Sequence, residues 1–211
     1  KARRGYQNMS NWREFYENKN ILITGASSGI GRKMVEKLAS VEGTGLVLLG
    51  RDKNALAEVE NSILKGHDKY QIFIRDLSNL ESLFNIKENL KSDLVPDVLV
   101  NNAGVGLYGQ FWKQDMAEID GMMKVNINSL VYLTHTFLPA MIKKRSGGIL
   151  NIASISSFVP CPGLNVYGAT KTFVKAFTEG LRVETESKGI HVVCYHPAGT
   201  DTKWHKRALG E

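Results

Sequence analysis

The sequence predicts a single α/β domain built on a doubly wound parallel sheet. Short apolar runs alternate at least five times with amphipathic stretches, and no Pro-, Gly- or Ser-rich linker divides the 211 residues. The composition, 43% hydrophobic and 23% charged, is that of a globular protein with one sizeable core. Regular alternation of strand and helix is typical of a sheet that helices cover on both faces.

The expected strands are apolar on both faces, as parallel strands between two helical layers require. They comprise residues 21–23, 46–49, 72–74, 98–100, 149–152 and 192–195. The expected helices show apolar residues at helical spacing. They comprise residues 32–40, 53–65, 80–91, 115–144 and 167–187. Because ligands of such sheets bind at the carboxyl ends of the strands, functional motifs should follow strands directly.

Residues 1–20 are expected to form an N-terminal extension with a short helix. Trp12, Phe15 and Tyr16 recur there at helical spacing. An aromatic helix face that packs on the sheet is favoured over a binding surface.

The net charge of +6 comes with basic clusters at the N-terminus, at residues 143–145 and at residues 203–207. A nucleic-acid or anionic membrane surface is one interpretation. We favour solvated charge at helix ends, without a nucleic-acid partner, because the clusters lie far apart and few stacking aromatics separate them.

Neither a membrane span nor a signal peptide is visible, which predicts an intracellular, cytoplasmic protein and leaves open an anchor or targeting segment upstream. Cys161 and Cys194 fit a reducing compartment and are expected to be buried packing residues. The five histidines lack metal-ligand spacing, so no metal is predicted.

A glycine-rich turn follows the first expected strand. It reads Thr-Gly-Ala-Ser-Ser-Gly-Ile-Gly over residues 24–31, and a helix follows from Arg32. Glycines let backbone amides approach a diphosphate, and the helix N-terminus adds a positive dipole end. An ordinary tight turn is the alternative, but its place between strand and helix favours a nucleotide site. The predicted contacts are Gly25, Ser27, Ser28, Gly29, Ile30 and Gly31.

Arg51 ends the second expected strand, where proteins that prefer NAD present a carboxylate to the ribose 2′-hydroxyl. A guanidinium there would pair with a 2′-phosphate, so the residue favours NADP(H) over NAD(H). Asp52 would cap the next helix or pair with Arg51. Asp76, which precedes Leu77 and Ser78 after the third strand, would accept from the adenine amino group or act as a helix N-cap, for which Ser78 is also suited.

Together these motifs resemble the short-chain dehydrogenase/reductase family. The pattern continues with Asn101-Asn102-Ala103-Gly104 after the fourth strand, Asn126, Ser154 after the fifth strand, and Tyr167-Gly168-Ala169-Thr170-Lys171, and it spans residues 20 to about 202. The resemblance implies a three-layer Rossmann-type fold, a nicotinamide cofactor, and a catalytic tetrad of Asn126, Ser154, Tyr167 and Lys171. It also implies cofactor contacts from Asp76, Leu77, Asn102, Ala103, Gly104, Tyr167, Lys171, Pro197, Thr200 and Thr202.

The last motif departs from the family pattern. Relatives usually carry Pro-Gly-x-Val-x-Thr after the sixth strand, whereas residues 197–202 read Pro-Ala-Gly-Thr-Asp-Thr. The family continues into a helical substrate-covering loop and a seventh strand. We therefore expect residues 21–211 to form an NAD(P)-binding catalytic domain that is incomplete at the C-terminus, with the lid and last strand missing.

Tyr167 and Lys171 stand four residues apart, which places phenol and ammonium on one helix face. The ammonium is expected to lower the pKa of the tyrosine and to hold the nicotinamide ribose. The Ser154 hydroxyl would share the substrate oxygen with Tyr167. No Gly-x-Ser-x-Gly elbow surrounds Ser154, which argues against a serine nucleophile. Asn126 is either a satisfied buried amide or the holder of a proton-relaying water.

The expected activity is reversible NADP(H)-dependent reduction of a carbonyl, with Tyr167 as acid and base. The alternative is a cofactor-binding regulatory or scaffold protein without turnover. Residues 106–108, 156–158 and Leu164 indicate a partly apolar pocket for a lipophilic small-molecule carbonyl or alcohol. A homodimer or homotetramer is expected from the resemblance.

Overall fold

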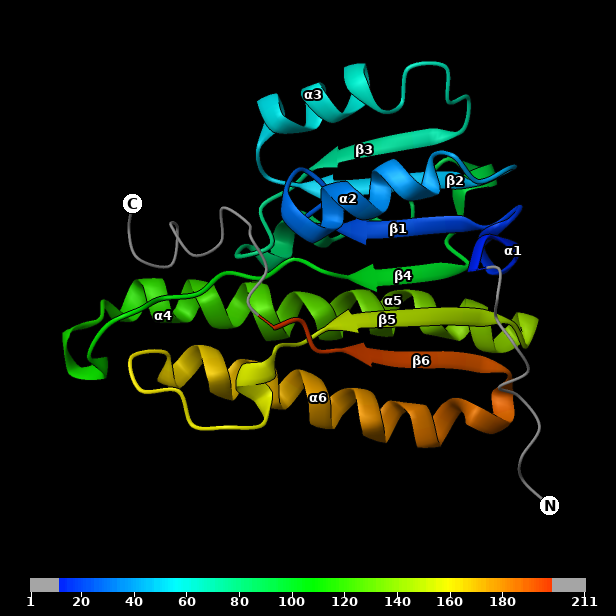
Figure 1. Ribbon diagram of the computed structural model, residues 1–211. Helices are drawn as coiled ribbons and strands as arrows, with labels where there is room; N and C mark the ends of the chain where they lie inside the picture. Colours follow the sequence, from blue (N-terminus) through cyan, green and yellow to red (C-terminus); the bar gives the residue numbers. More distant parts are fainter. Residues whose placement is uncertain (1–11, 199–211) are drawn as a thin grey trace.

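The computed structural model describes residues 12–198, which form a six-stranded parallel sheet in the order β3-β2-β1-β4-β5-β6 (Figure 1). The strands are β1 (Asn20–Thr24), β2 (Gly45–Gly50), β3 (Tyr70–Ile74), β4 (Val98–Asn101), β5 (Gly147–Ile152) and β6 (Ile190–Tyr195). The chain adds β2 and β3 on one side of β1 and then returns to add β4, β5 and β6 on the other. This order confirms the doubly wound α/β fold and puts the topological switch point between β1 and β4.

Five of the six α-helices between residues 12 and 198 lie between strands, and α1 precedes β1. The six are α1 (Trp12–Tyr16), α2 (Gly29–Leu38), α3 (Lys53–Ser62), α4 (Met116–Met123), α5 (Ser129–Lys144) and α6 (Asn165–Thr185). A π-helical turn, Lys124–Asn128, joins α4 to α5, so the helix expected over residues 115–144 exists with a wide turn in its middle. Asp115 caps its start by accepting from the amides of Ala117 and Glu118.

Two apolar layers hold the sheet between its helices. Alternate strand residues enter opposite layers, since successive strand side chains point to opposite faces. Leu46 and Leu48 pack with Val35 of α2 and Val59 of α3. Val47 and Leu49 join the layer formed by Leu133, Phe137 and Met141 of α5 and by Leu181 of α6. The three-layer architecture therefore follows from strands that are apolar on both faces.

The expected helix over residues 80–91 is wrong. Only the 3-10 turn Leu80–Leu83 forms, and further turns follow it. Phe84 is extended, and Asn85 has a φ of 58°, a left-handed conformation that interrupts a helix and that asparagine tolerates. Leu83 and Ile86 are nonetheless buried, so the apolar residues that suggested a helix pack into the core from a series of turns.

The short aromatic helix near the N-terminus is confirmed as α1. Phe15 and Tyr16 pack on the layer that contains Ile21 and Leu46, whereas Trp12 is 37% exposed. The predicted division into residues 1–20 and 21–211 stays a prediction, since residues 1–11 and 199–211 lie outside the described part. None of the helices between residues 12 and 198 combines the length and apolar character needed to cross a bilayer.

Buried and exposed side chains alternate along β6, so the same substitution at neighbouring positions should change the free energy of unfolding by different amounts. Val192 is 4% exposed within the core and Val193 is 54% exposed. Val192→Ala should lower the free energy of unfolding by about 2 kcal/mol, because it removes buried methyl groups. Val193→Ala should lower the free energy of unfolding by less than about 1 kcal/mol, because an exposed valine contributes only its preference for strand conformation. Urea unfolding of both variants measures this, and equal losses would contradict the assignment of faces.

Candidate active site

One large cavity opens at the carboxyl ends of the strands. Its volume is about 840 Å³, and it extends from the glycine turn after β1 past the loop after β4 to α6. Most residues expected at the site line this cavity: Gly25, Ser27, Ser28, Gly29, Ile30, Arg51, Asp76, Leu77, Asn102, Ala103, Gly104, Ser154, Tyr167, Lys171 and Pro197. Gly31 and Asn126 do not line it, and Thr200 and Thr202 fall outside the described residues.

The glycine turn presents the start of α2 to this cavity. Within the described part of the chain, Ser28 makes no capping hydrogen bond and the first helical turn carries no acidic residue. Such a helix start offers backbone amides to an anion. A Cβ at Gly31 would collide with the carbonyl oxygen of Gly25, so glycine is required there for the turn to close onto the helix. The turn thus fits a diphosphate.

Hydrogen bonds tie this turn to the loop after β4. The Asn102 side-chain amide donates to the carbonyl oxygen of Thr24 at 2.8 Å. Thr24 Oγ1 accepts from the backbone amides of Asn102 at 3.0 Å and Ala103 at 2.9 Å. The two loops on either side of the switch point therefore form one rigid floor for the cavity.

Two arginines line one end of the cavity, beside the serines of the glycine turn. Arg51 follows β2, and Arg75 follows β3. Arg75 was missed by the sequence reasoning, although its position directly after the third strand was a usable signal. Two guanidinium groups that line the same cavity match the charge of a 2′-phosphate.

The carboxylates at this end have local partners. Asp52 accepts from the Ala55 amide at 3.0 Å and caps α3, which decides between the two roles that the sequence left open for it. Asp76 Oδ1 accepts from the Ser78 amide at 2.9 Å and from the Ser78 hydroxyl at 2.8 Å. These hydrogen bonds, together with the nearby charge of Arg51, keep the pKa of Asp76 below its ordinary value. Asp52 therefore acts first as a helix cap, whereas Asp76 closes a turn with Ser78 and does not cap a helix.

Tyr167 on α6 lies buried beside Ser154, which follows β5. Burial raises the pKa of Tyr167 above its ordinary value, and the hydrogen bond with Ser154 partly offsets this by lowering it. The expectation that Lys171 lowers the pKa of this tyrosine is therefore wrong for the structure as it stands. The ammonium lies 5.8 Å from the centre of the phenol ring, and burial of the phenol is the largest cause of the shift in its pKa.

Lys171 is fully buried one turn further along α6. Its Nζ donates to the carbonyl oxygen of Ile152, at the end of β5, at 2.9 Å. Desolvation lowers the pKa of Lys171 from 10.5 to about 8. A Cβ at Gly104 would lie only 3.0 Å from Nζ, so the glycine after β4 leaves the room that the ammonium occupies.

Asn126 lies in the π-helical turn and is fully engaged. Its Oδ1 accepts from the Val105 amide, and its Nδ2 donates to the Val105 carbonyl oxygen and to Thr170 Oγ1, each at 2.9 Å. The side chain is therefore satisfied within the protein, and the predicted role with a proton-relaying water stays a prediction. It joins the loop after β4 to α6 next to Lys171.

The opposite end of the cavity is mainly apolar. Leu107, Met122, Ile155 and Leu164 line it, and Glu118 adds one carboxylate. Met122 and Glu118 stand four apart on α4 and were missed by sequence reasoning, because their approach to the cavity depends on how α4 packs. Of the expected pocket residues, Gly106, Leu107, Ser156 and Leu164 line the cavity, whereas Tyr108, Ser157 and Phe158 do not.

The sequence profile of the short chain dehydrogenase family matches residues 19–209. The chain belongs to this family. Solved structures agree with the assignment. A short-chain dehydrogenase from Sphingobium yanoikuyae in complex with NADPH superposes with a TM-score of 0.83 at 34% identity, covering 89% of this chain and 73% of that one. The bulky-bulky ketone specific alcohol dehydrogenase from Comamonas testosteroni gives 0.81 at 33% identity, covering 87% and 74%.

A curated relative is the very-long-chain 3-oxoacyl-CoA reductase of Rattus norvegicus, 35% identical over 192 residues. The match covers 88% of this chain and 60% of the rat protein. As a short-chain dehydrogenase, the chain is an oxidoreductase with a Rossmann-type fold. The described residues contain no cluster of three or more His, Cys, Asp or Glu side chains able to hold a metal ion.

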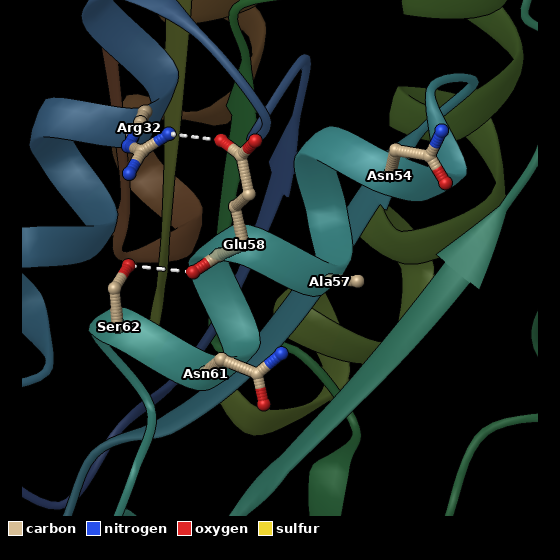
Figure 2. A pocket seen from close by; sticks show the side chains of 6 residues that line it. All are labelled: Arg32, Asn54, Ala57, Glu58, Asn61 and Ser62. Carbon is tan, nitrogen blue, oxygen red and sulfur yellow. Dashed lines mark hydrogen bonds and ion pairs between the residues drawn. The ribbon is translucent and has the colours of Figure 1, made fainter.

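A second hollow of this short-chain dehydrogenase lies on the surface between α2 and α3, with a volume of about 540 Å³. Figure 2 shows Arg32 and Glu58 pointing toward one another across it, joined by an ion pair of 3.4 Å. Ser62 Oγ donates to the Glu58 carbonyl oxygen. Because its charged groups are paired with each other, this hollow is assigned no role in binding.

The buried lysine predicts a pH dependence of stability. Because the pKa of Lys171 in the folded chain, about 8, lies below that of the unfolded chain, the ammonium costs stability below pH 8 and the cost falls as pH rises toward 10. The wild type should therefore gain stability relative to Lys171→Met between pH 7.5 and pH 9.5, by roughly 1–2 kcal/mol. Urea unfolding at both pH values measures the gain. Lys188→Met, at an exposed position after α6, serves as control. If the wild type gained as much stability relative to Lys188→Met over the same pH range, the assignment to Lys171 would be contradicted.

Proposed function

We propose that this chain is an NADP(H)-dependent oxidoreductase that reduces a lipophilic carbonyl, or oxidises the corresponding alcohol, with Tyr167 as the proton donor and acceptor. The observation that carries the proposal is that Tyr167, Ser154 and Lys171 line the same cavity as the uncapped start of α2. A reacting carbonyl and a dinucleotide therefore have adjoining places in one cavity.

A bound nicotinamide supplies or accepts the hydride in this proposal. The raised pKa of Tyr167 keeps the phenol protonated at neutral pH, ready to donate to the oxygen of a carbonyl. The Ser154 hydroxyl, beside the phenol, is suited to orient that oxygen. The Lys171 ammonium is suited to hold the nicotinamide ribose and to favour the phenolate once the proton has left.

The preference for NADP(H) rests on Arg51 and Arg75, which line the cavity near Ser27. A 2′-phosphate would form charge-assisted hydrogen bonds with these guanidinium groups, which the 2′-hydroxyl of NAD(H) cannot match. The NADPH complex of the Sphingobium relative supports the same choice. Gly25, Ser27, Ser28, Gly29 and Ile30 are proposed to hold the diphosphate.

The substrate class is proposed from the apolar end of the cavity. Leu107, Met122 and Leu164 would contact a hydrocarbon group next to the reacting carbonyl. The names of two relatives support a large lipophilic substrate, since one reduces very-long-chain 3-oxoacyl-CoA and the other is specific for bulky-bulky ketones.

We also propose a homodimer or homotetramer. Phe84 is 54% exposed and Phe173 on α6 is 39% exposed, and aromatic side chains at such positions are typical of subunit contacts.

Replacing Tyr167 tests the proposed chemistry. Tyr167→Phe removes the proton donor, so reduction of a 3-oxoacyl thioester, a steroid ketone or a simple aldehyde should slow by about 100-fold or more. NADPH should still raise the thermal unfolding temperature, because the cofactor contacts stay in place. Tyr195→Phe, at an exposed position, is the control. Full activity of Tyr167→Phe would exclude this proton donor, and NADPH binding by a wild type without turnover would favour the scaffold alternative.

Replacing the arginines tests the cofactor preference. Arg51→Ala and Arg75→Ala should each raise the Kd for NADPH by roughly 10- to 100-fold, because each removes one charge-assisted hydrogen bond to the 2′-phosphate. The Kd for NADH should stay nearly unchanged. Fluorescence titration with both cofactors measures the values. Arg182→Ala on α6 is the control. Parallel losses for NADPH and NADH would contradict a role at the 2′-phosphate.

A further inference from the structure

Two side chains outside the tetrad, Ser157 and His196, contact the backbone carbonyl oxygen of Ser154 and each other. Ser157, which is buried, donates its hydroxyl to the Ser154 carbonyl oxygen at 2.5 Å. His196, directly after β6, places Nδ1 2.9 Å from Ser157 Oγ and 3.2 Å from the same carbonyl oxygen. The Ser157 amide also donates to this oxygen, at 3.1 Å.

These contacts favour one tautomer of the imidazole. The Ser154 carbonyl oxygen only accepts, and the single hydroxyl proton of Ser157 is already directed at it. Nδ1 can therefore bond to both neighbours only as a donor. Both contacts are hydrogen bonds at the same time only when His196 carries a proton on Nδ1, which Ser157 Oγ and the Ser154 carbonyl oxygen then share.

The pair is unsuited to nucleophilic catalysis, although a serine and a histidine at 2.9 Å invite that comparison. A nucleophilic serine donates its proton to an unprotonated imidazole nitrogen. Here the serine hydroxyl donates to a backbone oxygen, and Nδ1 can contact the same oxygen only as a donor. The pair therefore holds the backbone of Ser154 instead of reacting.

The imidazole is itself held in place by its neighbours. The Phe158 ring packs against the imidazole with a centroid distance of 4.6 Å. Lys175 Nζ in turn lies 4.6 Å from the centroid of the same Phe158 ring. Backbone hydrogen bonds continue on both sides of His196, from the Ala153 amide to the Tyr195 carbonyl oxygen at 2.8 Å and from the Ile155 amide to the Pro197 carbonyl oxygen at 3.1 Å. His196 is thus fixed beside the residue whose carbonyl it contacts.

We propose that His196 is a positioning residue, which fixes the backbone of Ser154 through Nδ1–H and thereby holds the Ser154 hydroxyl beside Tyr167. The inference rests on the proposed function, because it gives Ser154 its role at the substrate oxygen. It adds a connection between the strand that leads to Pro197, on the cofactor side of the cavity, and the serine on the substrate side.

The position of Ser154 also affects Tyr167. Its hydrogen bond with Ser154 lowers the pKa of the phenol, against the larger effect of burial. A displaced Ser154 would weaken this bond, so the pH dependence of alcohol oxidation would move to higher pH. The other titratable groups near the phenol are Cys161, from the loop before α6, and Lys171, from α6 itself; neither contacts His196 in the bonds described.

The test combines a spectroscopic signature with matched variants. Long-range ¹H–¹⁵N NMR of the wild type should identify the neutral His196 ring as the Nδ1–H tautomer, assigned by its absence from His196→Asn. His196→Phe keeps a ring against Phe158 but removes the donor, and it should lower kcat about tenfold with the KM for NADPH unchanged. His196→Asn, whose amide can donate, should recover most of the loss.

The same substitution elsewhere on the strand is the control. His191→Phe, at an exposed position of β6, should match the wild type. If His196→Phe fails to fold, Ser157→Ala, which removes the other side-chain donor to the Ser154 carbonyl oxygen, should give a similar loss in kcat and the same shift to higher pH.

The outcomes separate this inference from the function on which it rests. An Nε2–H tautomer of His196 would overturn the inference whatever the turnover. Wild-type kcat in both His196→Phe and Ser157→Ala, in a protein that Tyr167→Phe inactivates, would overturn it while leaving the proposed function intact. Full activity of Tyr167→Phe would instead remove the proposed function, whereas the tautomer would still report on the hydrogen bonds.

Discussion

The burial of the Lys171 ammonium is the constraint to which the centre of the molecule is adapted. A buried cation is costly unless hydrogen-bond acceptors and space are provided for it. The end of β5 provides the Ile152 carbonyl oxygen, and Gly104 after β4 provides the space. Both are backbone features of neighbouring parallel strands, so the lysine can sit there only when β4, β5 and α6 are in their final register. Fold and site are therefore determined together.

The position of α6 is further fixed by polar contacts along one face. Thr170 accepts from Asn126, and Thr178 accepts from Asn151 at 2.9 Å on β5. Asn151 in turn accepts from Asn101 on β4 at 2.9 Å. Hydrogen bonds of this kind are directional, and a helix that slid by one residue would leave several buried polar groups unpaired. Tyr167, at the start of the same face, is thus held in register with the strand ends.

Features that depend on neighbours in sequence were predictable, and features that depend on packing were less so. Residue spacing predicted the glycine turn, the strands that are apolar on both faces, and a helix cap as one of two roles for Asp52. The motif from Tyr167 to Lys171 likewise placed two functional groups on one helix face. The failed helix over residues 80–91 shows that apolar spacing does not report where Asn85 turns the chain. The pKa of Tyr167 was predicted in the wrong direction, because the degree of burial belongs to the assembled sheet. His196 gave no recognisable signal, since its contacts span about 40 residues of sequence.

The raised pKa of Tyr167 and the lowered pKa of Lys171 have one cause, and it bears on the proposed reaction. Burial disfavours the charged form of each group, so near neutral pH the phenol keeps its proton while Lys171, with a pKa of about 8, is still largely charged. Donation of the phenol proton then creates a phenolate near an ammonium in a poorly solvated site, where opposite charges attract more strongly than in water. The ammonium accordingly contributes little to the resting phenol and most to the state that follows proton transfer. A tyrosine that is hard to ionise at rest, next to a cation that favours its ionised form, is suited to donating a proton to a carbonyl oxygen.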